Sequence, residues 1–581
     1  MDVVIEGERA TLADADLLGQ GGEGRVYRLG RRAVKVFHAP PAEKIQKLVD
    51  FPRGLPGGVV APIHLARDPQ RGDVVGYTMQ LVEKATDALR LGQRRFRHGT
   101  MGNGAVCALL RRLHEIVAQV HARGVIVGDL NDGNVVFTGT TPWLIDTDSM
   151  QFGAHHCTVA HERFLDPRLF GIDLTRAPRF DPASDWYAFA VLAFTSLLYV
   201  HPYGGQHKTI PTLLRRAEQR HSILRPDVAY PRAAAPLATL SDDLLDAFAR
   251  IFDRGDRDVF PLPLLSARWT RCACGVEHAR ASCPSCAARA QVPAVVRAGG
   301  VRATRVFSTR GRILAVAWQA GLRYAYVDDD GVIRREDGAR VPVAPSPTAR
   351  VALAGAVTWV HDDGVLQKIA GERVVARFDA TTFGASPAGC FYVAGDWLHD
   401  AATGARIAQV LGPTTWLEMG PRFGVGFYRA GRITVHFVLR PGRGMKRVPL
   451  PPIDGRLVDA AAAFDDDRAL VAVASEKDGR RTHALSLVRD DGEILARAEG
   501  SPESRALLAS VFGKCLANGA LLAATDDGLL LARPDPASGD FVEQKTFADT
   551  RDFVGAGADI LAGPQGSVYL VQSGEVVHLT T

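Results

Sequence analysis

The sequence predicts a multidomain protein with an α+β region, a small cysteine-rich ribbon and an all-β region of six or seven repeated sheets. Three observations predict this. The chain has 581 residues, more than a single hydrophobic core supports. Helical and strand periodicities alternate up to about residue 268, whereas short apolar runs between Gly-rich turns fill residues 291–581. Four cysteines gather between these stretches, within residues 269–290.

The bulk composition is that of an ordinary globular protein, with 46% hydrophobic and 23% charged residues. The net charge of +5 is small for this length and gives no argument for nucleic acid as a partner. The chain begins without a basic-then-apolar signal, and no apolar run approaches the length of a membrane span. We therefore expect a cytoplasmic protein without a membrane partner.

A glycine motif near the start of the chain is the first sign of chemistry. Gly19, Gly21 and Gly24 fall in Gly-Gln-Gly-Gly-Glu-Gly, and residues without Cβ let backbone N–H groups approach phosphate oxygens closely. Lys35 follows in Ala-Val-Lys-Val-Phe, an alternating run typical of a strand. Such a glycine motif is weak evidence alone. The position of Lys35 behind it favours a nucleotide-phosphate site over a solvated strand lysine.

A second motif lies further along the chain. Asp129 and Asn134 fall in Gly-Asp-Leu-Asn-Asp-Gly-Asn, and Asp146 ends the run Trp-Leu-Ile. With the glycine loop and Lys35, these residues resemble the ATP-handling parts of the two-lobed protein-kinase fold. The resemblance implies that Lys35 pairs with phosphates, and that Asp129 accepts or orients the substrate hydroxyl proton. Asn134 and Asp146 would hold Mg²⁺, since amide and carboxylate oxygens suit this hard cation.

The same resemblance assigns further ATP-site residues before the second motif. Val26 and Ala33 would pack on the adenine ring. Backbone groups from Gln80 to Val82, after the last strand of the small lobe, would hydrogen-bond adenine. A short helix is expected after Pro-Pro, and Glu43 in its first turn is the candidate ion-pair partner of the motif lysine.

The downstream part distinguishes two kinds of phosphotransferase. Phe-Leu-Asp-Pro at 164–167 resembles the end of a protein-kinase activation segment, and Ser-Asp at 184–185 resembles the start of the long helix whose Asp braces the catalytic loop. Small-molecule phosphotransferases of the aminoglycoside type lack this peptide-binding segment. The pattern therefore favours a protein Ser/Thr kinase. The expected domain is 1–268, with a small lobe of about 1–84 and a large lobe of about 85–268.

Three features of this chain are especially similar to one bacterial group of kinases. They are Gly128-Asp-Leu-Asn, Leu144-Ile-Asp-Thr-Asp-Ser149 and the Cys/His cluster that follows. This group comprises the kinases associated with von Willebrand-A proteins and metal-dependent phosphatases in tellurium-resistance-type systems. The resemblance covers roughly the first half of the chain. It implies Mg-ATP-dependent phosphorylation of Ser or Thr on a protein substrate, opposed by the companion phosphatase.

The chain departs from the common kinase pattern around these motifs. No arginine precedes Asp129 to bind a phosphate on the activation loop, so regulation by loop phosphorylation is not expected. The departures are Val127-Gly128 for His-Arg, Asn131 for a lysine, Asp148 for the Gly of Asp-Phe-Gly, and Arg168 for the Glu of Ala-Pro-Glu. A pseudokinase that binds ATP without transfer is therefore one alternative, and a small-molecule phosphotransferase is another.

The cysteine-rich stretch contains two thiol pairs separated by a short loop. Four thiolates make a closed structural zinc site, and the neighbouring Gly and Pro suit tight knuckle turns. A redox Cys-x-x-Cys is the alternative, but a second pair nearby favours metal. The expected ligands are Cys272, Cys274, Cys283 and Cys286, with His278 in reserve. We expect a zinc ribbon at 269–290 that joins two larger domains.

The second half carries repeated turns such as Asp362-Asp-Gly364, Asp490-Asp-Gly492 and Asp526-Asp-Gly528. Hairpins at intervals of several tens of residues are typical of propeller blades, and six or seven blades fit residues 291–581. A pair of β-sandwiches is the alternative. The sequence offers no acid pair or Cys/His arrangement for catalysis here. We expect a β-propeller that recruits the protein substrate or a partner to the kinase-like domain.

Overall fold

The structure is a computed structural model of residues 1–581. It describes the chain except residues 14–15, 21–22, 98–99, 232–233, 273–275, 290–294, 329, 347–348, 431–432, 478, 573 and 581. The side chains of residues 20, 95, 287–289, 295–298 and 565 are also outside the description.

The chain begins with a seven-stranded antiparallel sheet in the order β2-β1-β6-β7-β5-β4-β3. Side chains alternate between its faces. Val34 and Tyr27 lie in a buried apolar cluster on one face, whereas Phe37 and Tyr77 pack with Leu48 of helix α1 on the other. The elements are β1 (Asp2–Ile5), β2 (Glu8–Thr11), β3 (Leu17–Gln20), β4 (Gly24–Leu29), β5 (Arg32–Phe37), α1 (Ala42–Val49), β6 (Leu65–Arg67) and β7 (Val74–Gln80).

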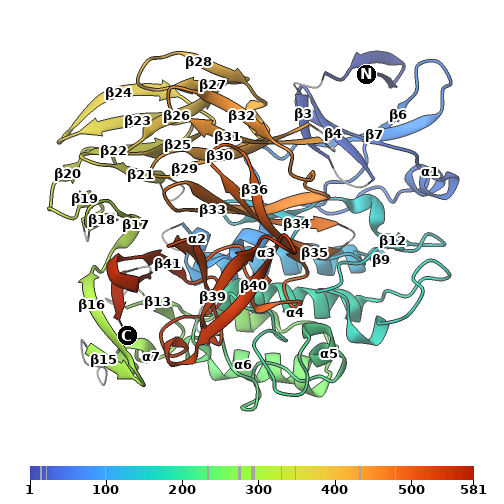
Figure 1. The fold of residues 1–581 in the computed structure, drawn as a ribbon. Coiled ribbons are helices and arrows are strands. Elements are labelled where there is room, and N and C mark those ends of the chain that lie inside the picture. Colours follow the sequence, from blue (N-terminus) through green and yellow to red (C-terminus); the bar gives the residue numbers. More distant parts are fainter. Residues whose placement is uncertain are drawn as a thin grey trace.

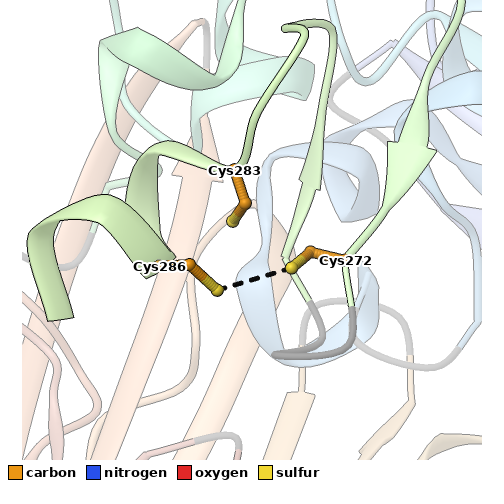
Figure 2. A group of neighbouring side chains, drawn as sticks. All are labelled: Cys272, Cys283 and Cys286. Atoms are coloured by element: carbon orange, nitrogen blue, oxygen red, sulfur yellow. Dashed lines mark hydrogen bonds between the residues drawn. The ribbon is translucent and has the colours of Figure 1, made fainter. Parts of the chain in front are cut away.

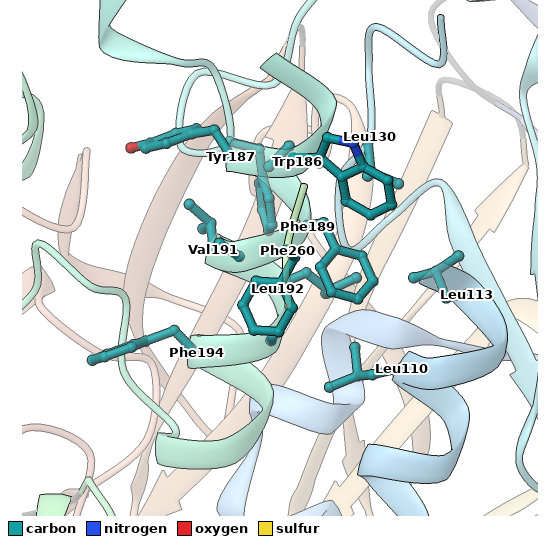
Figure 3. Close-up of a cluster of buried hydrophobic side chains, with 14 of the residues drawn as sticks. Leu110, Leu113, Leu130, Trp186, Tyr187, Phe189, Val191, Leu192, Phe194 and Phe260 are labelled. Atoms are coloured by element: carbon teal, nitrogen blue, oxygen red, sulfur yellow. The ribbon is translucent and has the colours of Figure 1, made fainter. Parts of the chain in front are cut away.

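A helical part follows, built around α3 and α4. Helix α4 begins at a capping box in which Asp181 and Ser184 satisfy each other's backbone N–H groups. Its apolar side chains, among them Phe189 and Leu192, pack against Leu110 and Leu113 of α3 (Figure 3). The helices are α2 (Arg94–Arg97), α3 (Asn103–His121), α4 (Pro182–Leu198), α5 (Leu213–Glu218) and α6 (Asp242–Ala249). Among the described residues, no helix is both long and apolar enough to cross a membrane.

Four short strands described between α3 and α4, together with β8 before α2, hold the loops that carry the predicted motifs. A three-stranded sheet has the order β11-β10-β8, and β9 pairs with β12. The strands are β8 (Thr86–Asp87), β9 (Val125–Ile126), β10 (Val135–Thr138), β11 (Thr141–Leu144) and β12 (Gln151–Phe152). After the helical part, the cysteine-rich segment has a two-stranded hairpin and a short helix. These are β13 (Thr270–Arg271), β14 (Glu277–His278) and α7 (Pro284–Arg289).

In the part of the chain that the structure describes, the remaining strands form seven antiparallel sheets, six of four strands and one of five. The innermost strands of successive sheets are neighbours from β17 to β41, and β41 also contacts β17, so the sheets close into a ring. We call these sheets the ring. The five-stranded sheet pairs β16 with the C-terminal β43 and thereby joins both ends of the ring. This all-β arrangement is compatible with the predicted propeller and differs from a pair of sandwiches. Of the six or seven blades expected from the sequence, the sheets of the ring match seven.

The strands of the ring range from two to ten residues in length. The first four sheets are β17 (Arg312–Trp318), β18 (Leu322–Val327), β19 (Ile333–Arg335), β20 (Arg340–Val341); β21 (Arg350–Ala354), β22 (Val357–Asp362), β23 (Val365–Ala370), β24 (Arg373–Asp379); β25 (Thr382–Ser386), β26 (Gly389–Ala394), β27 (Trp397–Asp400), β28 (Arg406–Gln409); and β29 (Thr415–Met419), β30 (Gly424–Ala430), β31 (Ile433–Arg440), β32 (Gly444–Val448). The last three sheets are β33 (Arg456–Phe464), β34 (Arg468–Lys477), β35 (Arg480–Arg489), β36 (Ile494–Gly500); β37 (Lys514–Ala517), β38 (Ala520–Thr525), β39 (Gly528–Asp535), β40 (Asp540–Phe547); and β15 (Val295–Ala298), β16 (Val301–Ser308), β41 (Asp559–Ala562), β42 (Val568–Val571), β43 (Glu575–Thr580).

The ring packs against the helical part of the N-terminal region (Figure 1). Leu89, in a 3₁₀ turn after β8, belongs to the same buried cluster as Val458 and Leu470 of the ring. Beside it, Arg90 Nη1 donates to Asp459 Oδ1 at 3.1 Å. The two halves of the chain are therefore in direct apolar and polar contact.

Candidate functional site

Lys35 lies on the inner strand β5 and is almost completely buried. Its register partners are Val26 on β4 and Tyr77 on β7, so the three side chains share one face of the sheet. Lys35 Nζ contacts Asp146 and donates to Asp148 Oδ1 at 2.8 Å. Burial lowers the pKa of Lys35, but Tyr77 and the two carboxylates outweigh it and hold the pKa well above its usual value.

Asp146 and Asp148 follow β11 on one tight turn but differ in environment. Asp146 has a positive φ of 57°, and 44% of its side chain is exposed, against 1% for Asp148. Asp148 Oδ1 also accepts from the Tyr77 hydroxyl at 2.7 Å, and its Oδ2 lies 3.0 Å from Lys44 Nζ. Burial raises the pKa of Asp148, yet Lys35 and Lys44 overcome this and hold it below its usual value. Asp148 is therefore a buried, charged carboxylate.

Helix α1 contributes a cation, Lys44, to this group of charged side chains. Lys44 contacts Glu23, whose Oε2 lies 3.6 Å from Lys35 Nζ. Glu43, the expected partner of Lys35, is exposed on the helix, and the carboxylates found within ion-pair distance of Lys35 are those of Asp146, Asp148 and Glu23. The pairing of Lys35 with Glu43 is thus replaced because the turn after β11 brings Asp148 closer than α1 brings Glu43. We call Lys35, Lys44, Glu23, Asp146 and Asp148 the lysine–carboxylate cluster.

The remaining small-lobe candidates lie around this face. Gly24 is needed because a Cβ there would lie only 2.3 Å from the Val36 carbonyl oxygen. Gly19 lies on β3, and Gly21 falls outside the described residues. Ala33 is buried and is register partner of Met79. Gln80 is the exposed last residue of β7, and Val82 follows it, half-buried.

Asp129 is held in a loop (residues 127–134), which we call the Asp129 loop. Its Oδ1 accepts from Asn131 Nδ2 at 2.9 Å and from the backbone N–H of His161 at 2.8 Å. Its Oδ2 accepts from Asn134 Nδ2 at 3.0 Å. The Asn134 carbonyl accepts from Ile145 N at 2.9 Å, which places Asn134 beside the turn that carries Asp146. The predicted residues Asp129, Asn134 and Asp146 thus lie on neighbouring segments.

A buried carboxylate on α4 fixes the start of the Asp129 loop. Asp185 accepts from the backbone N–H groups of Val127 at 2.7 Å and Gly128 at 2.8 Å, and it contacts His121 Nε2 at 2.8 Å. Gly128 has a φ of 76°, and a Cβ there would lie 2.8 Å from Cys157 Cβ. Only glycine fits this position, which explains why the chain has Gly128 before Asp129.

Two contacts near this loop have no signal in the sequence. Asp166 is fully buried and accepts two bonds from Arg257, at 2.7 and 3.1 Å. On the side of the ring, Glu476 accepts from His161 Nε2 at 3.0 Å and from Arg456 Nη2 at 3.2 Å. Because the backbone of His161 also donates to Asp129, the ring reaches the Asp129 loop through one residue.

The cysteine-rich segment brings three of the predicted thiols together. Sγ atoms of Cys272, Cys283 and Cys286 lie within 4.8 Å of one another, with 3.4 Å between Cys272 and Cys286 (Figure 2). Tetrahedral zinc with Zn–S bonds near 2.3 Å separates its sulfurs by about 3.8 Å, so these thiols fit such a site. Cys274 lies outside the described residues. His278 is buried in β14, and its Nδ1 accepts from Arg280 N at 3.3 Å.

A second group of metal-ligand side chains, His207, His221 and Asp227, lies after α4. His207 Nδ1 accepts backbone N–H groups from Thr209 at 3.3 Å and Ile210 at 3.1 Å. The proton of the neutral ring is then on Nε2, which lies 3.4 Å from Asp227 Oδ2. A nitrogen that carries its proton is not a metal ligand. This group is better explained by histidine–aspartate hydrogen bonds than by a cation site.

Comparison with known proteins adds no relative to this picture. No protein-family model matches the chain, and no curated protein matches it. The reaction that this site supports is therefore inferred from its side chains, their distances and their burial.

Proposed function

We propose that this protein is an ATP- and Mg²⁺-dependent protein serine/threonine kinase. One observation carries the proposal: Lys35, Asp146 and the Asp129–Asn134 pair come from three separate segments that are in contact with one another. A buried lysine beside an exposed carboxylate suits a phosphate chain with its cation. A second carboxylate, that of Asp129, is held by two side-chain amides and one backbone N–H group and suits a hydroxyl proton.

The roles follow from the exposure of each group. Lys35 would pair with phosphate oxygens, and Asp146 with Asn134 would hold Mg²⁺ through oxygen atoms. Bound Mg²⁺ would neutralise charge on the transferred phosphoryl group. Asp129, oriented by Asn131 and His161, would accept the hydroxyl proton of a Ser or Thr.

The surrounding fold supports this proposal. Strands β3, β4, β5, β7 and β6 are consecutive in an antiparallel sheet with α1 packed on one face, the arrangement expected for the small lobe of a protein kinase. Asp185 braces the Asp129 loop from a long buried helix. By the same resemblance, we propose a von Willebrand-A protein and a metal-dependent phosphatase as functional partners, and a structural zinc on the cysteine-rich segment.

We assign substrate recruitment to the ring. In its β34–β35 hairpin, Gly479 packs on the backbone of residues 160–162, where His161 N donates to Asp129. On β33 of the same sheet, Arg456 Nη1 contacts Asp87 Oδ2 at 3.2 Å. A protein that presents a hydroxyl to Asp129 would lie near this hairpin. The ring would therefore select which polypeptide reaches the site.

The test uses the purified full chain with radiolabelled Mg-ATP and a basic protein substrate, followed by phosphosite mapping. Wild type should transfer phosphate to Ser or Thr. Asp129→Asn should keep nucleotide binding but lose transfer about a hundredfold or more, whereas Asp146→Ala should lose Mg²⁺-dependent binding. Asp173→Asn, an exposed acidic residue bonded to Thr175, is the control and should behave as wild type.

The outcomes separate the alternatives. Wild type that binds Mg-ATP and transfers nothing would identify a pseudokinase scaffold. Transfer to a small hydroxyl compound but to no protein would identify a small-molecule phosphotransferase. Unchanged Mg²⁺-dependent affinity in Asp146→Ala would overturn the ATP site itself.

A further inference from the structure

We propose that Asp148 is the residue that positions Lys35 for the ATP phosphates, in place of a carboxylate on helix α1. This inference rests on the proposed kinase function and names a positioning residue of the same site. It differs from the sequence-based expectation, in which Glu43 on α1 had that role and Asp148 was only a departure from a glycine.

The contacts of Asp148 satisfy what such a residue requires. It is 2% exposed, so its carboxylate needs partners from the protein. Lys35 Nζ and the Tyr77 hydroxyl both donate to its Oδ1, at 2.8 and 2.7 Å. Lys44 Nζ lies 3.0 Å from Oδ2. These groups come from β5, β7 and α1, and together they fix the carboxylate against the sheet.

Asp146 and Asp148 divide two tasks between them. Asp146 also contacts Lys35, but nearly half of its side chain is exposed, which leaves it accessible to a metal. Mg²⁺ bound there would compete with the ammonium group for the Asp146 carboxylate. Lys35 would then keep a partner because Asp148 is buried and has both oxygens in contact with cations or a hydroxyl. Its ammonium would stay directed at the phosphates.

The charge balance of the lysine–carboxylate cluster agrees with this division. Two ammonium groups face three carboxylates, those of Glu23, Asp146 and Asp148. The cluster is thus net negative and suited to accept one divalent cation on its exposed side. Helix α1 contributes the cation Lys44, so the position of Lys35 depends on the turn after β11 rather than on a carboxylate of α1.

The test measures kcat and KM for Mg-ATP on the full chain. Asp148→Asn removes the charge with little change in size and should lower kcat/KM about tenfold or more, because the Lys35 ammonium is no longer held towards the phosphates in the bound state or in the transition state. Glu43→Gln is the matched control and should stay within about twofold. Tyr77→Phe keeps the carboxylate but removes one of its bonds, and should lower kcat/KM about two- to threefold.

A double-mutant cycle separates positioning from a merely structural role. If Asp148 acts through Lys35, adding Asp148→Asn to Lys35→Met should cause no further loss of transfer. A structural residue would add its own loss. Melting temperatures from circular dichroism show whether each variant is folded; if Asp148→Asn is not, Tyr77→Phe decides, and wild-type kcat/KM in that variant overturns the proposal.

The two proposals fail in different ways. An active wild type whose Asp148→Asn variant is equally active refutes the positioning role and leaves the kinase assignment intact. A wild type that neither binds nor transfers refutes the kinase assignment. If wild type binds Mg-ATP without transfer, the dissociation constants of the same variants decide, with Asp148→Asn expected to be weaker by about tenfold and equal affinity counting against Asp148.

Discussion

The N-terminal region and the ring are stabilised by different kinds of buried group. The N-terminal region buries carboxylates, and Asp148, Asp166 and Asp185 each accept several hydrogen bonds there. Buried side chains described in the ring are mostly apolar or neutral. Burying a charge costs free energy unless partners are arranged around it. In the N-terminal region, the buried carboxylates therefore lie where they hold a loop or a lysine in one position.

The ring follows the opposite pattern because each sheet buries its faces against its neighbours. Clusters such as Phe391, Val393 and Leu417 join adjacent sheets without polar groups. Its most buried acidic side chain near the Asp129 loop is Glu476, 10% exposed, and it faces the N-terminal region. One exception therefore lies where the ring meets the candidate site, and the buried pair of Arg335 with Glu336 is another.

The largest expected effect concerns the segment that joins the two regions. We predict one zinc per chain, because the three described thiols are close enough for zinc and a fourth, Cys274, is nearby in sequence. Cys283→Ser or chelation should remove the metal and unfold this short segment, since so few residues hold no core of their own. Elemental analysis and limited proteolysis measure this, with cleavage expected between residues 270 and 295.

Two further observations make this test specific. The segment docks on the N-terminal region, where Glu277 accepts from Asn103 N and Ala279 N donates to Thr239 O at 2.8 Å. Cys390→Ser, a buried thiol of the ring, is the control and should keep the metal. Protein without zinc, or a cleavage pattern that chelation leaves unchanged, would rule out the metal and with it the idea that two separately folded regions share a metal joint.

The next effect tests the dependence of the N-terminal region on buried charge. Arg257→Met removes two of the four hydrogen bonds that the fully buried Asp166 accepts, the other two coming from Arg168, and should destabilise this region by about 2–3 kcal/mol. Arg505→Met in the ring breaks a partly exposed pair with Asp540 and should cost about 1 kcal/mol or less. Hydrogen exchange of helix α4 and of strand β40 measures the two losses. Equal losses would contradict the contrast between the regions.

Sequence motifs identify the groups that would contact ATP but not those that hold them. Lys35, Asp129 and Asn134 follow from local patterns because glycine loops and acid–amide loops have typical spacings. The partner of Lys35 does not, since Asp148 is 113 residues away along the chain and its contact depends on how β5 and β11 meet. A helix carboxylate was the natural choice from local spacing, and the structure replaces Glu43 with Asp148.

The same limit applies to the fold. Regular turns predict repeated sheets in the second half, because each hairpin is local. The pairing of β16 with β43 joins the two ends of the ring, and no local pattern indicates it. Nor does the sequence indicate that Leu89 packs with Leu470 of the ring, since both are ordinary apolar residues.

Low pH should destabilise the ring, because the ring buries histidines that are neutral in the folded state. Burial lowers the pKa of His483 to about 4 and that of His436 to about 4. Each imidazole is neutral when folded but protonates near pH 6.5 when unfolded. Stability is therefore full above about pH 6.5 and falls as the pH drops towards 4, by up to ~3 kcal/mol per histidine. His483→Gln, which can keep a bond to the Leu508 carbonyl, should flatten this part of the stability–pH curve; an unchanged slope would show that His483 contributes nothing to it.

The smallest expected effect lies at the contact between the regions. Glu476 accepts from His161, Arg481 and Arg456. Burial raises its pKa, but these donors outweigh burial and hold it below the usual range. Its contribution is thus complete above about pH 4.3 and is lost as the pH falls further. Glu476→Gln keeps the shape and removes the charge, so we expect a loss of about 1–2 kcal/mol.

The loss should be local and visible by hydrogen exchange. Faster exchange is expected in residues 126–134 and 158–165, because His161 donates to Asp129 and loses its charged partner in the ring. Glu493→Gln, on the same sheet, breaks an exposed pair with Arg489 and should change exchange at neither segment. Unchanged exchange in Glu476→Gln would mean that the other contacts between the regions, such as those of Leu89 and the Arg90–Asp459 pair, hold the ring in place without it. The buried carboxylate by which the ring reaches the Asp129 loop would then have no mechanical role there.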